Sequence, residues 1–416
     1  MTEKHKILVI SDSPLVPSGV GTQTKYMIEA MLETGEYSFV CLAGAIRHLD
    51  YRPTKVEPWG DDFIIVPVDG YGSQQQVRSM IQAHKPSALW FMTDPRFYGW
   101  LWEMEDEVRS KIPMIYYHVW DNYPYPTFNR KWYNSNDVIA TISKVTDDIV
   151  KQVSPEVESI RVPHTVDTDV FRKMQKSEYN SIFSAVNKGE KMLFFWNNRN
   201  ARRKQSGSLI YWFKDFLDVI GHDKAILLMH TEPKDPNGQD LEKIMKELGL
   251  TDGQVLLSTQ KMPPQELAKL YNAADCTINI SDAEGFGLAT LESLATETPI
   301  IVNMTGGLQE QVTDGEKWFG IGLQPSSKAI IGSQEVPWIY EDRLNGQEVV
   351  DALLQFYNLS PEEREEMGRN GREHVLNEYG NQLFKDNWVS LFNNTIEKHG
   401  SYENRKNYKS WEFKQI

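Results

Sequence analysis

The sequence has few cysteines and no apolar run of membrane-spanning length. Cys41 and Cys276 are its only two cysteines in 416 residues, and each lies in an apolar run of the kind that forms a buried strand. This disfavours a disulfide framework, and we expect a reducing, cytoplasmic environment. A spanning helix needs about 20 apolar residues, and no run approaches that length, so we also expect no transmembrane segment.

Basic residues are outnumbered by acidic ones. The chain carries 44 Lys and Arg against 58 Asp and Glu, a net charge of −14, and the first 180 residues carry 19 against 24. A surface of this sign repels phosphate backbones and anionic lipid headgroups. Nucleic acid and membranes are therefore disfavoured as partners, although a local basic cleft stays compatible with the charge.

Short motifs of several common cofactor sites are also missing. No cluster of His, Cys or carboxylates has the spacing of metal ligands. The glycine loop at residues 17–22 has neither the Gly-Lys-Ser/Thr ending of a Walker loop nor the spacing of a dinucleotide fingerprint. We therefore expect no metal ion and no bound cofactor.

Short apolar runs instead alternate with amphipathic stretches, a pattern typical of parallel sheets flanked by helices. A polar stretch near residues 170–190 separates two such series. The expected strands are residues 6–11, 38–43, 62–68, 88–92, 114–118 and 138–143, then 192–197, 225–230, 254–258, 276–280 and 300–303. Expected helices include residues 74–83, 99–111, 207–220, 240–248, 265–274, 288–295 and 381–397.

We therefore predict an α/β chain with two Rossmann-like, doubly wound domains. The first spans residues 1–175 and the second 176–380, and a helical tail, 381–416, is expected to return to the first domain. Because ligands of such sheets bind at the carboxyl ends of the strands, we expect the site in a cleft between the two domains.

The segment Ser281-Asp282-Ala283-Glu284-Gly285-Phe286-Gly287-Leu288 follows an expected strand and opens a helix. Unpaired N–H groups at a helix start, together with the helix dipole, suit phosphate or sugar hydroxyls. Glu284 can accept hydrogen bonds from sugar hydroxyls, and Glu292 can bond the vicinal hydroxyls of a ribose. On spacing alone, however, both would be ordinary exposed acids at a helix start.

A basic loop, Asn198-Arg199-Asn200-Ala201-Arg202-Arg203-Lys204, follows the first strand of the second series. Fixed cations stabilise the charge that develops on a diphosphate leaving group. A solvated basic loop is the alternative interpretation.

Together with their flanks, these segments resemble the retaining family 4 glycosyltransferases of the GT-B fold. The signature of that family is a glutamate, seven residues and a second glutamate, and Glu284 and Glu292 match it. Residues 267–275, 298–301 and 306–315 match the family's flanking segments. The resemblance implies metal-independent transfer of a sugar from a nucleoside diphosphate sugar to an acceptor hydroxyl, with retention at the anomeric carbon.

The resemblance also implies roles for individual residues. Arg199 and Lys204 match the family's cationic pair, although Asn198 and Gln205 stand where the family has glycines. The implied catalytic residues are Arg199, Lys204, His118 and Glu284, and the implied donor-binding residues are Gly19, Gly21, Asn198, Glu284, Gly285, Phe286, Gly287, Leu288 and Glu292. His118 is expected to end a strand and to point toward the donor sugar.

An aromatic run at residues 120–133 is the candidate for the acceptor site, with Trp120, Asp121, Tyr123 and Arg130 as its residues. Aromatic faces stack on sugars and on bases, but a rigid packed loop is an equal alternative. The charge favours a soluble glycan or small molecule as acceptor. A hydroxymethylated base of DNA is the runner-up, and a sugar-nucleotide epimerase, a phosphorylase or a non-catalytic sensor of the same fold is less favoured.

Overall fold

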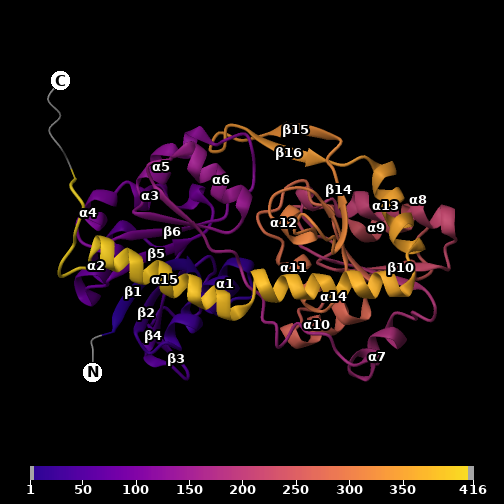
Figure 1. The fold of residues 1–416 in the computed structure, drawn as a ribbon, viewed down its shortest axis with the longest axis horizontal. Coiled ribbons are helices and arrows are strands. Elements are labelled where there is room, and N and C mark those ends of the chain that lie inside the picture. The colour runs from indigo at the N-terminus through magenta and orange to yellow at the C-terminus, as the bar shows by residue number, and fades with distance from the viewer. Residues whose placement is uncertain (1–3, 411–416) are drawn as a thin grey trace. The chain divides into compact units, whose positions relative to one another are not determined.

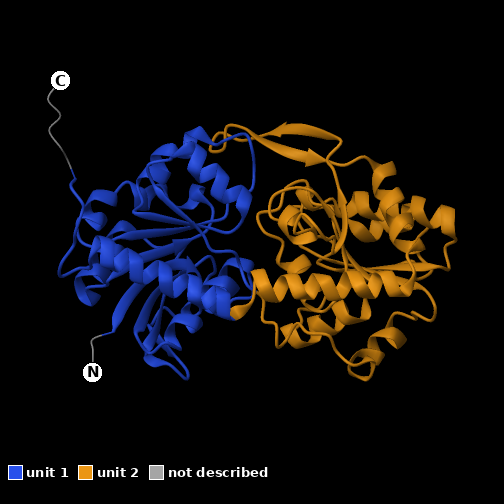
Figure 2. Cartoon of the chain, viewed as in Figure 1, with its two compact units in different colours: residues 1–165, 382–416 blue, residues 166–381 orange. Residues whose placement is uncertain are grey.

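The computed structural model describes residues 4–410 and divides the chain into two compact units (Figure 1, Figure 2). Unit 1 comprises Met1–Thr165 and Gln382–Ile416, and unit 2 comprises Val166–Asn381. The unit boundaries fall at residues 165 and 381, where the sequence predicts domain boundaries at 175 and 380.

Unit 1 is built on an eight-stranded sheet with the order β3-β4-β2-β1-β5-β6-β7-β8. Only β3 runs antiparallel to its neighbour. The strands are β1 (His5–Asp12), β2 (Tyr37–Gly44), β3 (Thr54–Val56), β4 (Gly60–Pro67), β5 (Ala88–Met92), β6 (Met114–His118), β7 (Val138–Thr141) and β8 (Glu158–Arg161). The central strands are buried along their whole length, as parallel strands covered by helices on both faces are.

Helices connect these strands. They are α1 (Gly19–Leu32), α2 (Gln74–His84), α3 (Gly99–Trp102), α4 (Glu105–Arg109), α5 (Arg130–Asn134) and α6 (Lys144–Val153), with α15 (Asn381–His399) added from the end of the chain. The single helix predicted over residues 99–111 is wrong, because the structure breaks it into α3 and α4. Trp102, the last residue of α3, stacks on Trp132 at a ring distance of 5.4 Å.

Helix α15 completes the core of unit 1. The Trp388 side chain is fully buried and lies 5.8 Å from the Trp90 ring of β5 and 4.9 Å from the Tyr117 ring of β6. Figure 1 shows α15 lying across the unit 1 sheet. Late residues of the chain therefore fill a core that is otherwise built from its first 165 residues.

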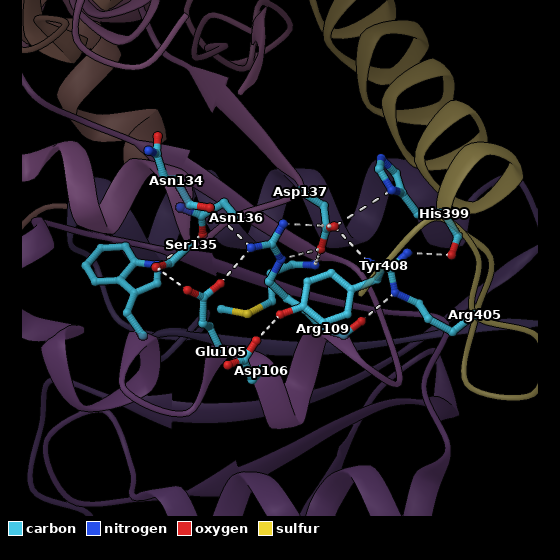
Figure 3. Close-up of polar contacts among 12 residues, drawn as sticks. Glu105, Asp106, Arg109, Asn134, Ser135, Asn136, Asp137, His399, Arg405 and Tyr408 are labelled. Atoms are coloured by element: carbon cyan, nitrogen blue, oxygen red, sulfur yellow. Dashed lines mark hydrogen bonds and ion pairs between the residues drawn. The ribbon is translucent and has the colours of Figure 1, made fainter. Parts of the chain in front are cut away.

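The residues that follow α15 are held to unit 1 by polar contacts around Asp137 (Figure 3). Arg405 donates to the buried Asp137 carboxylate at 2.7 Å, and Arg109 also pairs with it at 3.3 Å. Arg405 Nε donates to the Arg109 carbonyl at 2.6 Å. These contacts neutralise a buried carboxylate and fix residues 400–408 along one side of the unit.

Unit 2 is built on a six-stranded parallel sheet with the order β11-β10-β9-β12-β13-β14. Its strands are β9 (Met192–Asn197), β10 (Ala225–His230), β11 (Val255–Ser258), β12 (Cys276–Asn279), β13 (Ile300–Asn303) and β14 (Gly320–Leu323). A separate antiparallel hairpin consists of β15 (Ser327–Ile331) and β16 (Ile339–Arg343). The two parallel sheets confirm the predicted fold class.

The helices of unit 2 are α7 (Lys176–Ala185), α8 (Ser206–Ile220), α9 (Leu241–Glu247), α10 (Pro264–Ala273), α11 (Leu288–Ala295), α12 (Leu308–Val312), α13 (Gly346–Asn358) and α14 (Pro361–Glu378). Helix α7 lies in the polar stretch near residues 170–190 that separates the two predicted series of strands and helices. It is stabilised by a capping box between Gln175 and Glu178 and by the packing of Tyr179 on Phe183.

Candidate functional site

The site in unit 2 lies where the strand order of the sheet reverses. The chain proceeds from β9 to β10 and β11 in one direction and from β12 to β13 and β14 in the other. Strands β9 and β12 are neighbours, with Phe194 opposite Cys276. The loops that follow them, residues 198–205 and 280–287, therefore leave the same edge of the sheet at its switch point, where open α/β sheets bind their ligands.

These two loops meet in an ion pair between Lys204 and Glu284. The Lys204 ammonium donates to Glu284 Oε2, and only 10% of the lysine side chain and 12% of the glutamate side chain are exposed. The backbones are joined as well, since the Asp282 N–H donates to the Arg203 carbonyl at 2.8 Å. The Arg203 guanidinium donates to the Ala283 carbonyl. The structure thus brings together two residues, 80 positions apart, that the sequence analysis assigned to one site.

Two opposing effects set the protonation state of Glu284 in this pair. Burial favours the protonated acid, but the nearby positive charges of Lys204 and Arg203 outweigh it and lower the pKa of Glu284. The Asn279 amide donates to the same carboxylate oxygen at 3.4 Å. At neutral pH Glu284 is therefore a carboxylate, able to accept hydrogen bonds, beside a fixed ammonium.

The start of α11 presents backbone N–H groups next to this pair. Gly287 precedes the helix with φ of +93°, a conformation that favours glycine, and no side chain within the described residues caps the helix. Two hydrogen bonds fix the loop before the helix. The Gly307 N–H donates to the Glu284 carbonyl at 3.1 Å, and Gln311 Nε2 donates to the Phe286 carbonyl at 2.7 Å. First-turn N–H groups at a helix start suit an anion.

Replacing Gly307 with alanine is expected to lower the stability of unit 2 by about 1–3 kcal/mol, the usual cost of an overpacked position. A Cβ atom at this position would lie 2.7 Å from the Gly285 carbonyl oxygen and 2.7 Å from the Phe286 Cα, so the backbone of the loop would have to move. Urea unfolding should show a lower midpoint. In the control Gly99→Ala, the added Cβ meets only a Trp132 ring atom at 4.0 Å, and an equal loss there would contradict this account.

Glu292 lies in the second turn of α11, within hydrogen-bond reach of Tyr271 on α10. The Tyr271 hydroxyl donates to Glu292 Oε2 at 2.7 Å and accepts from the Asn197 amide at 2.8 Å. Burial raises the pKa of Glu292 to about 7, although the tyrosine hydrogen bond favours the carboxylate. Its protonation therefore changes near neutral pH.

Arg199 points to a different partner from Lys204. Its guanidinium pairs with Asp235 at 2.6 Å, its side chain is 63% exposed, and this hydrogen bond lowers the pKa of Asp235 to about 2. The Nδ2 atom of Asn198 is buried with no hydrogen-bond partner. The roles of both residues toward a donor stay predictions.

Several residues outside the implied catalytic and donor-binding sets also contact the pair or its loops. Arg203 lies one residue before Lys204, and Asn279 ends β12 beside Glu284. Asp282 accepts hydrogen bonds from Gln205 at 2.6 Å and pairs with Arg343 at 2.8 Å. Asn279 could have been predicted from the sequence, because it is a polar residue at the end of a buried strand. Nothing in the sequence links Arg343 to this loop.

In unit 1, the predicted glycine loop follows β1 and leads into α1. Ser18 caps α1 by accepting from the Gly21 N–H at 2.9 Å, and its hydroxyl donates to Asp12 at 2.7 Å. A Cβ atom on Gly21 would lie 2.7 Å from the Ser13 carbonyl oxygen, so the tight turn requires glycine there. Gly19 is the first residue of the helix.

His118 ends β6 as predicted, but its side chain is fully buried in unit 1. Its Nε2 lies 2.7 Å from the Tyr133 hydroxyl and its Nδ1 lies 3.1 Å from the Tyr116 hydroxyl. Burial lowers the pKa of His118 to about 3, so the ring is neutral. A role beside the donor sugar therefore stays a prediction, and the contacts in the structure are those of a core residue.

The aromatic segment is partly packed and partly exposed. Trp120 is buried and donates to the Asn122 carbonyl at 2.7 Å. The hydroxyls of Tyr123 and Tyr125 donate to the same Asp148 oxygen at 3.0 and 3.1 Å. The Tyr125 side chain is exposed. Arg130 donates to the Val153 carbonyl at 2.8 Å, at the end of α6. Asp121 also has an interaction partner.

None of the helices within residues 4–410 combines the length and apolar character that crossing a membrane requires. No group of three or more His, Cys, Asp and Glu residues in the same range is arranged to hold a metal ion.

Comparison with known proteins gives matches to the second unit and to the whole fold. The family model described as "Glycosyl transferases group 1" matches residues 214–374, which include Glu284 and Glu292. A D-inositol 3-phosphate glycosyltransferase from Corynebacterium urealyticum is 41% identical over 76 residues. That match covers 18% of this chain and 18% of the relative, so the chain spans about a fifth of the length of the curated relative it matches.

Solved structures match over nearly the whole chain. Sucrose-phosphate synthase from Thermosynechococcus elongatus has a TM-score of 0.74 and 16% identity, and the match covers 95% of this chain and 100% of that one. HepE from Anabaena, solved in complex with UDP and glucose, has a TM-score of 0.70 and 14% identity over 94% and 100% of the two chains. At these identities the likeness concerns the fold. Residues 214–374 are therefore similar to the glycosyl transferases group 1 family, and the chain has a fold of the GT-B type.

Proposed function

We propose that this protein is a retaining glycosyltransferase that moves a sugar from a nucleoside diphosphate sugar to a hydroxyl of a polar acceptor. The single observation that carries the proposal is the buried Lys204–Glu284 ion pair beside the start of α11, at the switch point of a parallel sheet. A nucleoside diphosphate sugar offers both an anion and hydroxyl groups, and this pair matches them with an ammonium and a carboxylate.

Each part of the donor has a matching group in unit 2. The diphosphate would lie at the first-turn N–H groups of α11 and the Lys204 ammonium. The transferred sugar would donate a hydroxyl hydrogen bond to Glu284, and Glu292 would hold the ribose. The positive charge that stabilises the departing diphosphate comes from Lys204 and from Arg199 rather than from a metal ion.

Arg199 must change partner to act in this way. It pairs with Asp235, but its side chain is 63% exposed, and exposed ion pairs are weak, about 0–1 kcal/mol. Exchange of Asp235 for a diphosphate therefore costs little. Lys204 already lies beside the start of α11, so it contributes the larger share of the stabilisation of the departing diphosphate.

The acceptor is proposed to be a soluble glycan or a small polar molecule. The basic residues near the aromatic segment have internal contacts: Arg130 binds the Val153 carbonyl, Arg96 pairs with Asp94 at 2.9 Å, and Lys131 lies 3.9 Å from the centre of the Trp132 ring. No exposed set of unpaired cations is thus formed by these three residues. Transfer to hydroxymethylated DNA that falls steeply with salt would instead support the DNA acceptor.

Thermal unfolding with a panel of nucleotide sugars tests the donor. UDP-glucose is the first probe, since HepE was solved with UDP and glucose. A ligand that binds only the folded protein at 100 times its Kd adds about 2.7 kcal/mol. For units of this size that corresponds to a rise of about 5–10 °C in the midpoint. UMP and free glucose serve as controls, and a panel in which no nucleotide sugar shifts the midpoint would contradict the proposal.

A further inference from the structure

We propose that Glu341 and Arg343, on the hairpin strand β16, are positioning residues that hold the two donor loops of unit 2 in register. This inference rests on the proposed function, because it concerns the same site. It assigns a role to a hairpin that forms no part of the parallel sheet.

Four charged side chains connect the hairpin to both loops. Arg202, in the loop after β9, donates to the two oxygens of Glu341 at 2.6 and 2.9 Å. Arg343 donates to Glu341 Oε2 at 2.7 Å and pairs with Asp282, in the loop after β12, at 2.8 Å. The result is a continuous chain of ion pairs, Arg202–Glu341–Arg343–Asp282, which we call the outer chain.

The outer chain joins the same two loops as the Lys204–Glu284 pair. Arg202 precedes Lys204 by two residues, and Asp282 precedes Glu284 by two residues. Each loop is thus bound twice, once directly to the other loop and once through the hairpin. A shift of either loop would have to disturb both sets of contacts.

Burial makes the outer chain more than a surface ion pair. The Asp282 side chain is 2% exposed and that of Glu341 is 3% exposed. Burial raises the pKa of Asp282 to about 6, so at neutral pH its carboxylate form prevails and Arg343 has an anion to bind. Two buried carboxylates converge on Arg343, and without its charge they would repel each other.

Backbone contacts anchor the hairpin at the same place. The Asp342 N–H donates to the Asp282 carbonyl at 2.8 Å. Asn303, at the end of β13, donates from one amide nitrogen to the Asp342 carbonyl at 3.0 Å and to the Ser281 carbonyl at 2.9 Å. The hairpin therefore sits against the residues that lead directly into Glu284 and the start of α11.

A brace for overall stability is the other interpretation of these contacts, and the two predict different results. A stability brace would loosen all of unit 2 when it is removed. Positioning residues would loosen residues 281–287 selectively, and they would weaken binding of the donor while the core of the sheet stays protected.

The test compares Arg343→Met with Arg343→Lys, which keeps the charge, and with Arg369→Met, whose exposed arginine pairs with the exposed Glu365 at 3.7 Å. In the free protein, amide hydrogen exchange of residues 281–287 should rise at least tenfold in Arg343→Met, with β9 unchanged. The affinity for UDP-glucose should fall about tenfold. Arg343→Lys should recover most of both effects, and Arg369→Met should show neither.

The outcomes separate the two proposals. Unchanged exchange at residues 281–287, or an equal rise throughout unit 2, would overturn the positioning role. Wild-type protein that binds no nucleotide sugar would count against the proposed function, whereas the exchange measurement on the free protein would still decide the role of Arg343.

Discussion

Replacing Lys204 with methionine is expected to lower kcat for sugar transfer by about 10²- to 10³-fold, the usual cost of removing one fixed donor that stabilises transition-state charge. The ammonium is already held in place by Glu284 and is almost fully buried, so it needs no reorganisation when the diphosphate departs. Its charge also lowers the pKa of Glu284, so the variant loses a cation and raises the pKa of the neighbouring acid. Binding of the intact donor should weaken less than turnover, because the leaving group gains charge only as the bond breaks.

The measurement is the rate of nucleoside diphosphate release with acceptor present, paired with calorimetric binding of the donor. Lys224→Met is a matched control, since Lys224 is 52% exposed and pairs with the exposed Asp223 at 3.3 Å. Turnover in Lys204→Met equal to that of the control would refute the assigned role. A loss of donor affinity with kcat unchanged would mean that Lys204 acts in binding alone.

The affinity for UDP-glucose is expected to be about tenfold lower at pH 6 than at pH 8, and about tenfold lower again at pH 5. The ribose hydroxyls act as hydrogen-bond donors, so Glu292 must be a carboxylate to accept hydrogen bonds from both of them. Its pKa of about 7 means that protons compete with the ribose as the pH falls below 7. The two phosphates of a nucleotide sugar are diesters that stay ionised over this range, so the ligand itself adds no titration.

Two variants isolate the source of this pH dependence. Glu292→Gln should bind weakly at pH 8 and lose the change in affinity centred near pH 7, while any change from Asp282 near pH 6 remains. Tyr271→Phe removes the hydroxyl that favours the carboxylate, so its midpoint should move to higher pH. A flat wild-type profile between pH 5 and pH 8 would contradict a ribose contact through Glu292.

The parallel sheets were predictable because buried strands are continuous apolar runs. The strands 88–92, 114–118, 192–197, 225–230 and 300–303 have the predicted bounds. The hairpin of β15 and β16 was missed because β15 is mostly exposed and the residues of β16 are nearly all half-buried, so neither strand has a clear alternation. Helix α7 was missed because a polar composition hides an apolar pair, Tyr179 and Phe183, on one face.

The site was predictable in its parts but not in its pairings. Spacing and resemblance indicated Lys204 and Glu284 separately, and the strand order explains why they meet. The outer chain was not predictable, because Arg343 is 61 positions from Asp282 and no local pattern links them. For His118, the end of a strand could be predicted, but the face of the sheet from which the side chain projects could not.

The division of unit 1 between both ends of the chain has a consequence for biosynthesis. Unit 2 is one continuous segment and can close once residue 381 has left the ribosome. Unit 1 must wait for α15, since Trp388 covers Trp90 and Tyr117 in its core. Residues 4–165 can therefore complete their core only when α15 is available, and until then the faces of Trp90 and Tyr117 that Trp388 covers stay open to solvent.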